Sequence, residues 1–116
     1  MATKFDDSNL KVYRGDREPY KFTVTENGAP KDLSGHTITA QAREDFDSAT
    51  TLFDITITDS VDGNDHVNGI VVLIISSAIT TLLPEKSRYD IQAVLGTEKF
   101  TIAKGQLLLT KDVTRP

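Results

Sequence analysis

Apolar and polar residues alternate along most of this chain, as they do in β-strands that bury one face. Turn residues such as Asn27-Gly28 and Gly96-Thr97 lie between the alternating stretches. Strands are therefore predicted at Leu10–Tyr13, Tyr20–Val24, Thr37–Arg43, Phe53–Ile57, Ile70–Ile75, Tyr89–Leu95 and Lys99–Lys111. With about seven short strands at regular spacing, the pattern predicts an all-β fold, namely an immunoglobulin-like antiparallel β-sandwich.

One predicted strand, Ile70–Ile75, is apolar at every position. Successive side chains of a strand point to opposite faces, so both faces of this strand need cover. Two interpretations remain open. Either the strand is central and a turn, loop or terminal arm covers its second face, or that face docks onto another subunit. The docking interpretation predicts an exposed interface of Val71, Leu73, Ile75, Val94 and Leu108.

Two local features complete the predicted topology. Phe100 and Ile102 have the opposite parity to Leu107 and Leu109, which predicts a β-bulge at Gly105 in the last strand. The alternative is that Leu108 faces the core and its two neighbours face outward. Apolar and polar residues no longer alternate in the segment 76–83, which predicts one short helical turn capped by Ser77. Ile79, Leu82 and Leu83 of this turn are expected to pack against the rest of the domain.

The length of 116 residues suits one domain. The predicted domain spans residues 10–114, between an N-terminal arm (1–9) and a short C-terminal tail (115–116). The chain has no cysteine, no apolar run long enough to span a membrane and no secretory leader at its start. The net charge of −4, with both signs interspersed, disfavours binding to nucleic acid or to a membrane surface.

Candidate chemistry is sparse. His36 and His66 have no carboxylate or nucleophile at a catalytic spacing, and both are expected in exposed turns. Four oxygen-bearing side chains crowd the loop 59–69, namely Asp59, Asp62, Asn64 and Asp65. Their spacing does not match an EF-hand, so a plain solvated loop is favoured over an ion site. No hydrolase, zinc-protease or phosphate-loop motif occurs. The sequence therefore predicts a non-enzymatic protein with no cofactor, no metal and no catalytic residue.

The order of the turn and strand signals resembles a family of small tailed-phage virion domains, which includes the N-terminal domain of phage baseplate upper proteins. The shared pattern covers most of residues 10–114. It comprises Gly15-Asp16 before Tyr20-Lys21-Phe22-Thr23-Val24, then Pro30-Lys31-Asp32-Leu33-Ser34-Gly35, Gly69 before the apolar strand, Leu83-Pro84, the Tyr89-led strand, and a closing Gly105-to-Leu109 strand followed by Asp112-Val113-Thr114. The chain lacks the long C-terminal region of baseplate upper proteins.

The resemblance implies a bacteriophage virion structural protein, made in the host cytoplasm, that docks onto other virion proteins as a homo-oligomer. Capsid decoration, a head-tail or collar component and a tail-baseplate adaptor are the roles it allows, with many weak contacts combined by avidity. The alternative is a receptor- or carbohydrate-binding β-sandwich module of a phage or bacterial surface assembly. The absence of tryptophan and the inward parity of most aromatic residues disfavour that alternative.

Overall fold

The computed structural model describes residues 9–45 and 49–110. The strands in these ranges are β1 (Leu10–Tyr13), β2 (Glu18–Thr23), β3 (Thr25–Glu26), β4 (Ala29–Pro30), β5 (Thr37–Arg43), β6 (Phe53–Ile57), β7 (Ile70–Ile75), β8 (Lys86–Leu95) and β9 (Glu98–Thr110). A 3-10 helix, η1 (His66–Asn68), precedes β7, and an α-helix, α1 (Ser77–Leu82), follows it. Residues 1–8 of the predicted arm, residues 111–114 of the predicted domain and the predicted tail lie outside the described ranges.

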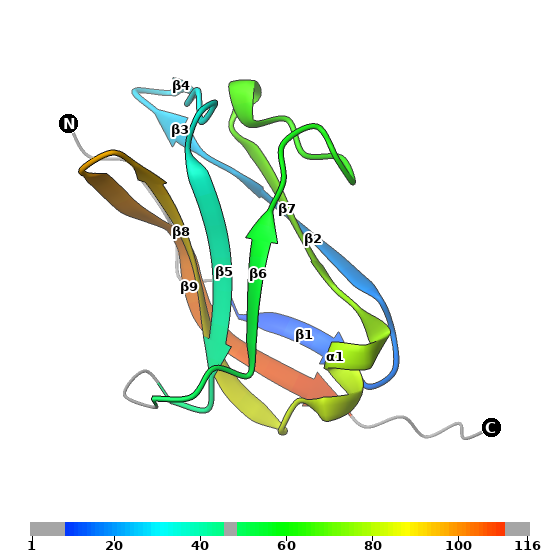
Figure 1. Ribbon diagram of the computed structural model, residues 1–116. Helices are drawn as coiled ribbons and strands as arrows, with labels where there is room; N and C mark the ends of the chain where they lie inside the picture. The colour runs from blue at the N-terminus through cyan, green and yellow to red at the C-terminus, as the bar shows by residue number, and fades with distance from the viewer. Residues whose placement is uncertain (1–8, 46–48, 111–116) are drawn as a thin grey trace.

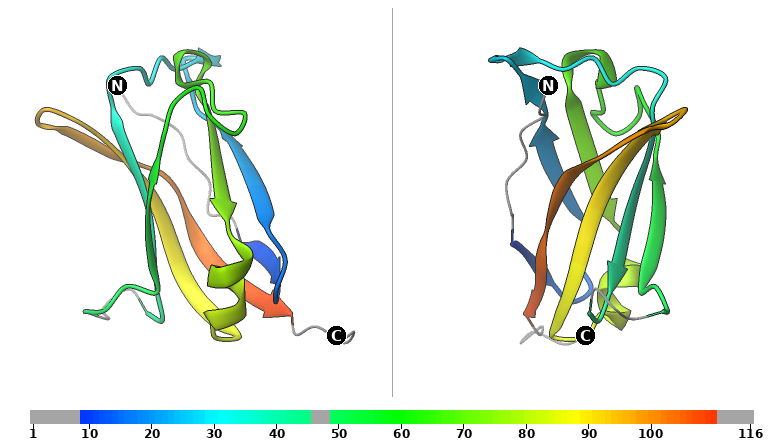
Figure 2. Two further views of the ribbon diagram at one scale, coloured as in Figure 1. Left: turned by 45° about the vertical axis from the view of Figure 1, so that its right-hand side comes forward. Right: turned by 90° about the vertical axis from the view of Figure 1, so that its left-hand side faces the viewer.

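The strands form two principal layers (Figures 1 and 2). In the larger sheet the order is β1-β9-β8-β5-β6, while β2 pairs with β7 in a smaller sheet of two strands. The smaller sheet packs across one face of the larger one, and β3 and β4 form a short hairpin at one end of the molecule (Figure 1). This arrangement confirms the predicted all-β, sandwich-like fold.

One pairing differs from the predicted antiparallel arrangement. Strand β1 runs parallel to β9, with Leu10 beside Leu107 and Val12 beside Leu109. The two strands come from opposite ends of the chain, so no hairpin dictates their relative direction. Hydrophobic alternation shows which face of a strand is buried but carries no information about the direction of its partner.

The core lies between the two layers. Alternate residues of the central strands β5 and β8 are fully or almost fully buried, as the alternation predicts; they are Ile38, Ala40, Ala42, Tyr89, Ile91 and Ala93. Across the interior, the ring of Phe22 on β2 meets that of Tyr89 on β8, with a centroid separation of 6.5 Å. The aromatic contact therefore links the small sheet to the middle of the large one.

A β-bulge interrupts β9, although not at the predicted place. Ile91 pairs with Ala103 and the next residue of β8, Gln92, pairs with Thr101, so Ile102 is the extra residue. Both Ile102 and Ala103 are buried. The bulge restores the inward register of Leu107 and Leu109, which are buried as expected. The register change thus occurs between two adjacent apolar residues, where both side chains gain burial, rather than at Gly105.

The predicted helical turn is α1, but its cap and its exposed face differ from expectation. Ser76, not Ser77, is the N-cap, and its Oγ accepts a hydrogen bond from the Ile79 amide at 3.4 Å. Leu82 is 82% exposed rather than packed against the sheet, whereas Leu83 is buried. The hydroxyl of Thr80 connects α1 to the β1–β2 turn, because it accepts from the Gly15 amide at 3.0 Å and donates to the Asp16 carbonyl at 2.9 Å. Within the described ranges, no helix has the length and apolar character needed to cross a membrane.

Candidate docking surface

The structure separates the five residues of the predicted interface. Val71, Leu73 and Ile75 are 0% exposed and belong to the core, so the expectation that they form an exposed face is wrong. Their side chains are part of the hydrophobic core between the two layers. Val94 (37% exposed) and Leu108 lie instead on the outer face of the large sheet, on β8 and β9. These two residues remain available for contact, and their role in docking stays a prediction.

The opposite face of β7 carries Ile70, Val72 and Ile74. Ile70 and Ile74 are half-buried, and Val72 is covered by the loop that connects β6 to η1. The structure therefore agrees with the first of the two interpretations of the apolar strand: one face fills the core, and a loop covers part of the other. Ile74 lies beyond the part of the strand that the loop covers.

A groove runs between the edge strand β6 and the end of β7. It has a volume of about 270 Å³, and its walls combine apolar side chains of both strands with Val61 from the connecting loop. Ile55 and Ile74 lie on the two sides, and Val61 is 48% exposed at the rim. Thr56 on β6 and Thr58, just after its end, add polar groups to the groove. This groove is where the second face of the apolar strand is incompletely covered.

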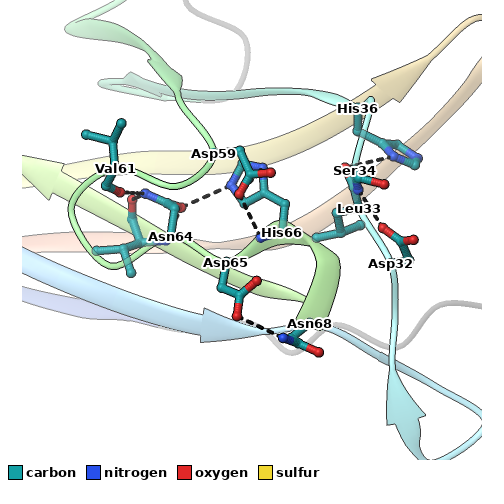
Figure 3. Close-up of polar contacts among 11 residues, drawn as sticks. Asp32, Leu33, Ser34, His36, Asp59, Val61, Asn64, Asp65, His66 and Asn68 are labelled. Carbon is teal, nitrogen blue, oxygen red and sulfur yellow. Dashed lines mark hydrogen bonds and ion pairs between the residues drawn. The ribbon is translucent and has the colours of Figure 1, made fainter.

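The side chain of Asn64 holds the covering loop in place (Figure 3). Its Oδ1 accepts a hydrogen bond from the Val72 amide at 2.7 Å, and its Nδ2 donates to the Val72 carbonyl at 3.2 Å and to the Val61 carbonyl at 2.8 Å. The side-chain amide thus satisfies the backbone of Val72 as a neighbouring strand would. Next to it, the backbones of Asp65 and Ile70 exchange two hydrogen bonds, of 2.9 and 3.0 Å. The loop therefore protects the edge of β7 from pairing with another chain.

The carboxylates of this loop are used to shape the loop itself. Asp59 Oδ1 accepts a hydrogen bond from the His66 amide at 3.0 Å, and this bond lowers the pKa of Asp59. Asp65 Oδ2 accepts from Asn68 Nδ2 at 2.8 Å (Figure 3). In the described part of the chain, no group of three or more histidine or acidic side chains is placed to hold a metal ion.

Neither histidine lies in an exposed turn, so that expectation is wrong. His66 is 2% exposed, and its Nε2 lies 3.1 Å from Asn64 Oδ1, which places the ring in the hydrogen-bond network of the loop. The His36 side chain is 5% exposed and meets the ring of Phe100 edge-on, while its Nε2 lies 3.4 Å from Glu98. His36 thus joins a turn to the distant strand β9, whereas the His66 side chain contacts residues of its own loop. Sequence spacing contains no sign of these contacts.

Comparison with known proteins identifies the fold but not a sequence family. No family model matches the chain, and no curated protein matches it in sequence. Among solved structures, the sandwich is similar to the N-terminal domain of phage TP901-1 ORF48, with a TM-score of 0.61 and 14% sequence identity. The likeness covers 90% of this chain and 86% of that domain. The predicted resemblance to a tailed-phage domain is therefore confirmed at the level of the fold.

Proposed function

We propose that this chain is a non-enzymatic structural protein of a bacteriophage virion that docks onto other virion subunits. The observation that supports this proposal is the fold shared with the N-terminal domain of phage TP901-1 ORF48 over 90% of the chain. The two layers provide a rigid body, and the partly apolar groove between β6 and β7 provides a surface that a neighbouring subunit would bury.

The groove is assigned as the docking site because it holds the accessible part of the apolar strand. Ile74 and Ile55 are half-buried, so a partner that fills the groove would remove their remaining apolar area from water. The loop already satisfies the β7 backbone at Ile70 and Val72. The partner is therefore expected to contribute side chains rather than an added strand along this part of the edge.

Purified particles of the phage that encodes the chain provide the test. The variants are Val61→Asp and Ile74→Asp in the groove, with Leu95→Asp as the control, because Leu95 is 46% exposed at the tip of the β8–β9 hairpin. Thermal melting first establishes that each variant folds. Quantitative mass spectrometry of the particles then measures incorporation. We expect wild type and Leu95→Asp at equal copy number, and both groove variants strongly depleted.

The outcomes separate the two parts of the proposal. Absence of the wild-type chain from the particles would refute the virion role. Full incorporation of folded groove variants would refute the groove as the docking site while leaving the virion role in place. A specific hit for the wild-type protein on a glycan array would support the carbohydrate-binding alternative instead.

A further inference from the structure

The outer face of the large sheet is strongly basic, although the whole chain has a net charge of −4. Strand register places the outward-facing side chains of β1, β9, β8, β5 and β6 in rows across this face. Two of those positions are acidic, Asp54 and Asp90. Six are basic, namely Lys11, Arg43, Lys86, Arg88, Lys99 and Lys104. The face therefore carries a net charge of +4, and the strands β9, β8, β5 and β6 lie side by side in the right-hand view of Figure 2.

Two of the cations are direct cross-strand neighbours. Arg43 on β5 is the register partner of Arg88 on β8, and both side chains are half-buried. Like charges placed directly opposite each other on a sheet are destabilising. Each guanidinium group contacts a glutamine side chain, and Arg43 also interacts electrostatically with Asp90. Arg43 Nη2 donates to Gln41 Oε1 at 3.3 Å, and Arg88 Nη1 lies 3.1 Å from Gln106, whose amide oxygen is oriented toward it.

The acidic side chains near these cations set the chemistry of a partner. On the sheet, Asp90 faces Lys104 and also lies near Arg43, and Asp54 Oδ2 accepts from Gln41 Nε2 at 3.1 Å. Beyond the end of β5, Glu44 and Asp45 share a hollow of about 260 Å³ with Lys86, Arg88 and Gln106. A uniform polyphosphate would meet these carboxylates as well as the cations. A protein surface can place its carboxylates opposite the arginines and its donors opposite the acids.

Other features of the face also favour a protein over a nucleic acid. Among the outward positions of the described sheet, only Tyr13, at the end of the edge strand β1, is aromatic, whereas proteins that bind single strands stack successive bases on several aromatic rings. Glutamine and threonine fill the remaining positions of these strands almost completely, and these side chains both donate and accept hydrogen bonds. Such a mixed surface suits the polar rim and charged pairs of a protein–protein contact.

We propose that the outer face of the five-stranded sheet, centred on Arg43 and Arg88, docks a carboxylate-rich surface of a partner protein. The surface is on the opposite side of the sheet from the core, and it meets the β6–β7 groove only at the edge strand, where Thr56 belongs to both. The proposal does not rest on the virion role. It adds a second contact surface to the molecule, and it states the charge that the partner must present there.

The test uses poly-L-glutamate as the probe and the isolated protein, with amide chemical shifts followed by NMR. We compare wild type with the double variant Arg43→Gln/Arg88→Gln. The matched control is Arg17→Gln/Lys21→Gln, which removes two exposed cations that lie before and within β2. Thermal melting verifies that both variants are folded. A duplex DNA oligonucleotide of equal total charge is titrated in parallel.

We expect poly-L-glutamate to shift amides of β5, β8 and β9 and to bind less tightly as salt is added. The arginine double variant should lose about tenfold in affinity, because each charge-assisted contact contributes more than a neutral one, and the control should lose less than about twofold. Absence of binding, shifts scattered over the whole surface, or an equal loss in the control would overturn the proposal. Tighter binding of the DNA to the same face would overturn it in favour of a nucleic-acid surface.

Discussion

At the scale of single residues, one buried amide decides how the loop between β6 and β7 is held. Asn64 makes three hydrogen bonds to backbone groups of Val61 and Val72, and His66 adds a fourth contact to the same side chain. A hydrophobic side chain at this position would leave the Val72 amide and carbonyl without these partners in a buried environment. Unsatisfied buried backbone groups are among the more costly defects in a folded protein.

Replacement of Asn64 is therefore expected to destabilise the protein. Asn64→Ala should lower the free energy of unfolding by about 2–4 kcal/mol, measured by urea denaturation, because it removes several buried hydrogen bonds at once. Asn68→Ala is the matched control, since Asn68 is exposed and its side chain donates a hydrogen bond to the side chain of Asp65 rather than to a buried backbone group. Equal stability of the two variants would contradict the role assigned to Asn64.

Gly69 is a second position where adding a single carbon atom is expected to destabilise the protein. Its φ is +73°, and a Cβ there would clash with the Val24 carbonyl oxygen and lie 3.0 Å from that of Lys31. Gly69→Ala should cost at least about 2 kcal/mol, because a backbone clash adds to the left-handed conformation. Gly96→Ala, at φ +59° with open space around the Cβ, should cost only about 1 kcal/mol. Chemical denaturation of both variants measures the difference, and similar costs would show that the close approach at Gly69 is relieved by a small shift.

The hydrogen bond from the His66 amide makes the contribution of Asp59 to stability depend on pH. This bond holds the pKa of Asp59 below its ordinary value of 3.8. The charged form is thus favoured in the folded state, so its stabilising effect is complete above the unfolded pKa and disappears as pH falls through the lower, folded pKa. Asp59→Asn should therefore lower the melting temperature at pH 7 and have little effect near pH 2. A deficit of the same size at both pH values would mean that the carboxylate charge is not the cause.

At the scale of elements, the face that each strand buries could be predicted only where the sequence alternates. Strands β5, β6 and β8 bury the residues that alternation selects, and every predicted strand exists. Strand β7 is apolar throughout, so its pattern does not show which of its two faces is buried. The prediction that Val71, Leu73 and Ile75 form the exposed face is wrong for this reason. The correct face depends on packing in the core between the two layers and on the loop 59–69, which are distant or irregular in sequence.

The same limit applies to the candidate surfaces. The groove between β6 and β7 brings together Ile55 and Ile74, whose strands do not pair with each other, and no local pattern reveals that approach. The basic face did leave a signal in the sequence, because Lys86 and Arg88 share one parity of a strand whose other parity is buried. Assigning charges to strand faces, rather than counting them over the whole chain, would have identified part of it.

The two faces of β7 should respond differently to truncation. Leu73→Ala removes a fully buried side chain and should cost about 2–5 kcal/mol, because it leaves a cavity in the core. Ile74→Ala removes a half-buried side chain next to open solvent, and its cost should stay below about 1.5 kcal/mol. Denaturant unfolding of the two neighbouring variants gives the comparison directly. Equal losses would mean that Ile74 is as deeply packed as Leu73.

At the scale of the whole molecule, the two layers differ in size, with five strands in the larger sheet and two in the smaller. This difference should determine which parts of the structure unfold locally first. Strand β8 pairs with β5 on one side and β9 on the other, and its inward side chains Ile91 and Ala93 are fully buried. The β3–β4 hairpin has only two residues in each strand, and its side chains are exposed or half-buried. Native-state hydrogen exchange should therefore find the slowest amides in β8 and its neighbours, and the fastest strand amides in β3 and β4.

The small sheet should lie between these limits, because β7 is supported by β2 on one side and by the Asn64 loop on the other. The two-layer arrangement predicts that Asn64→Ala accelerates exchange mainly in β7 and the loop, because the small sheet then opens separately from the large one. Equal acceleration throughout β8 would contradict this expectation and would mean that the loop and both sheets unfold as one cooperative unit.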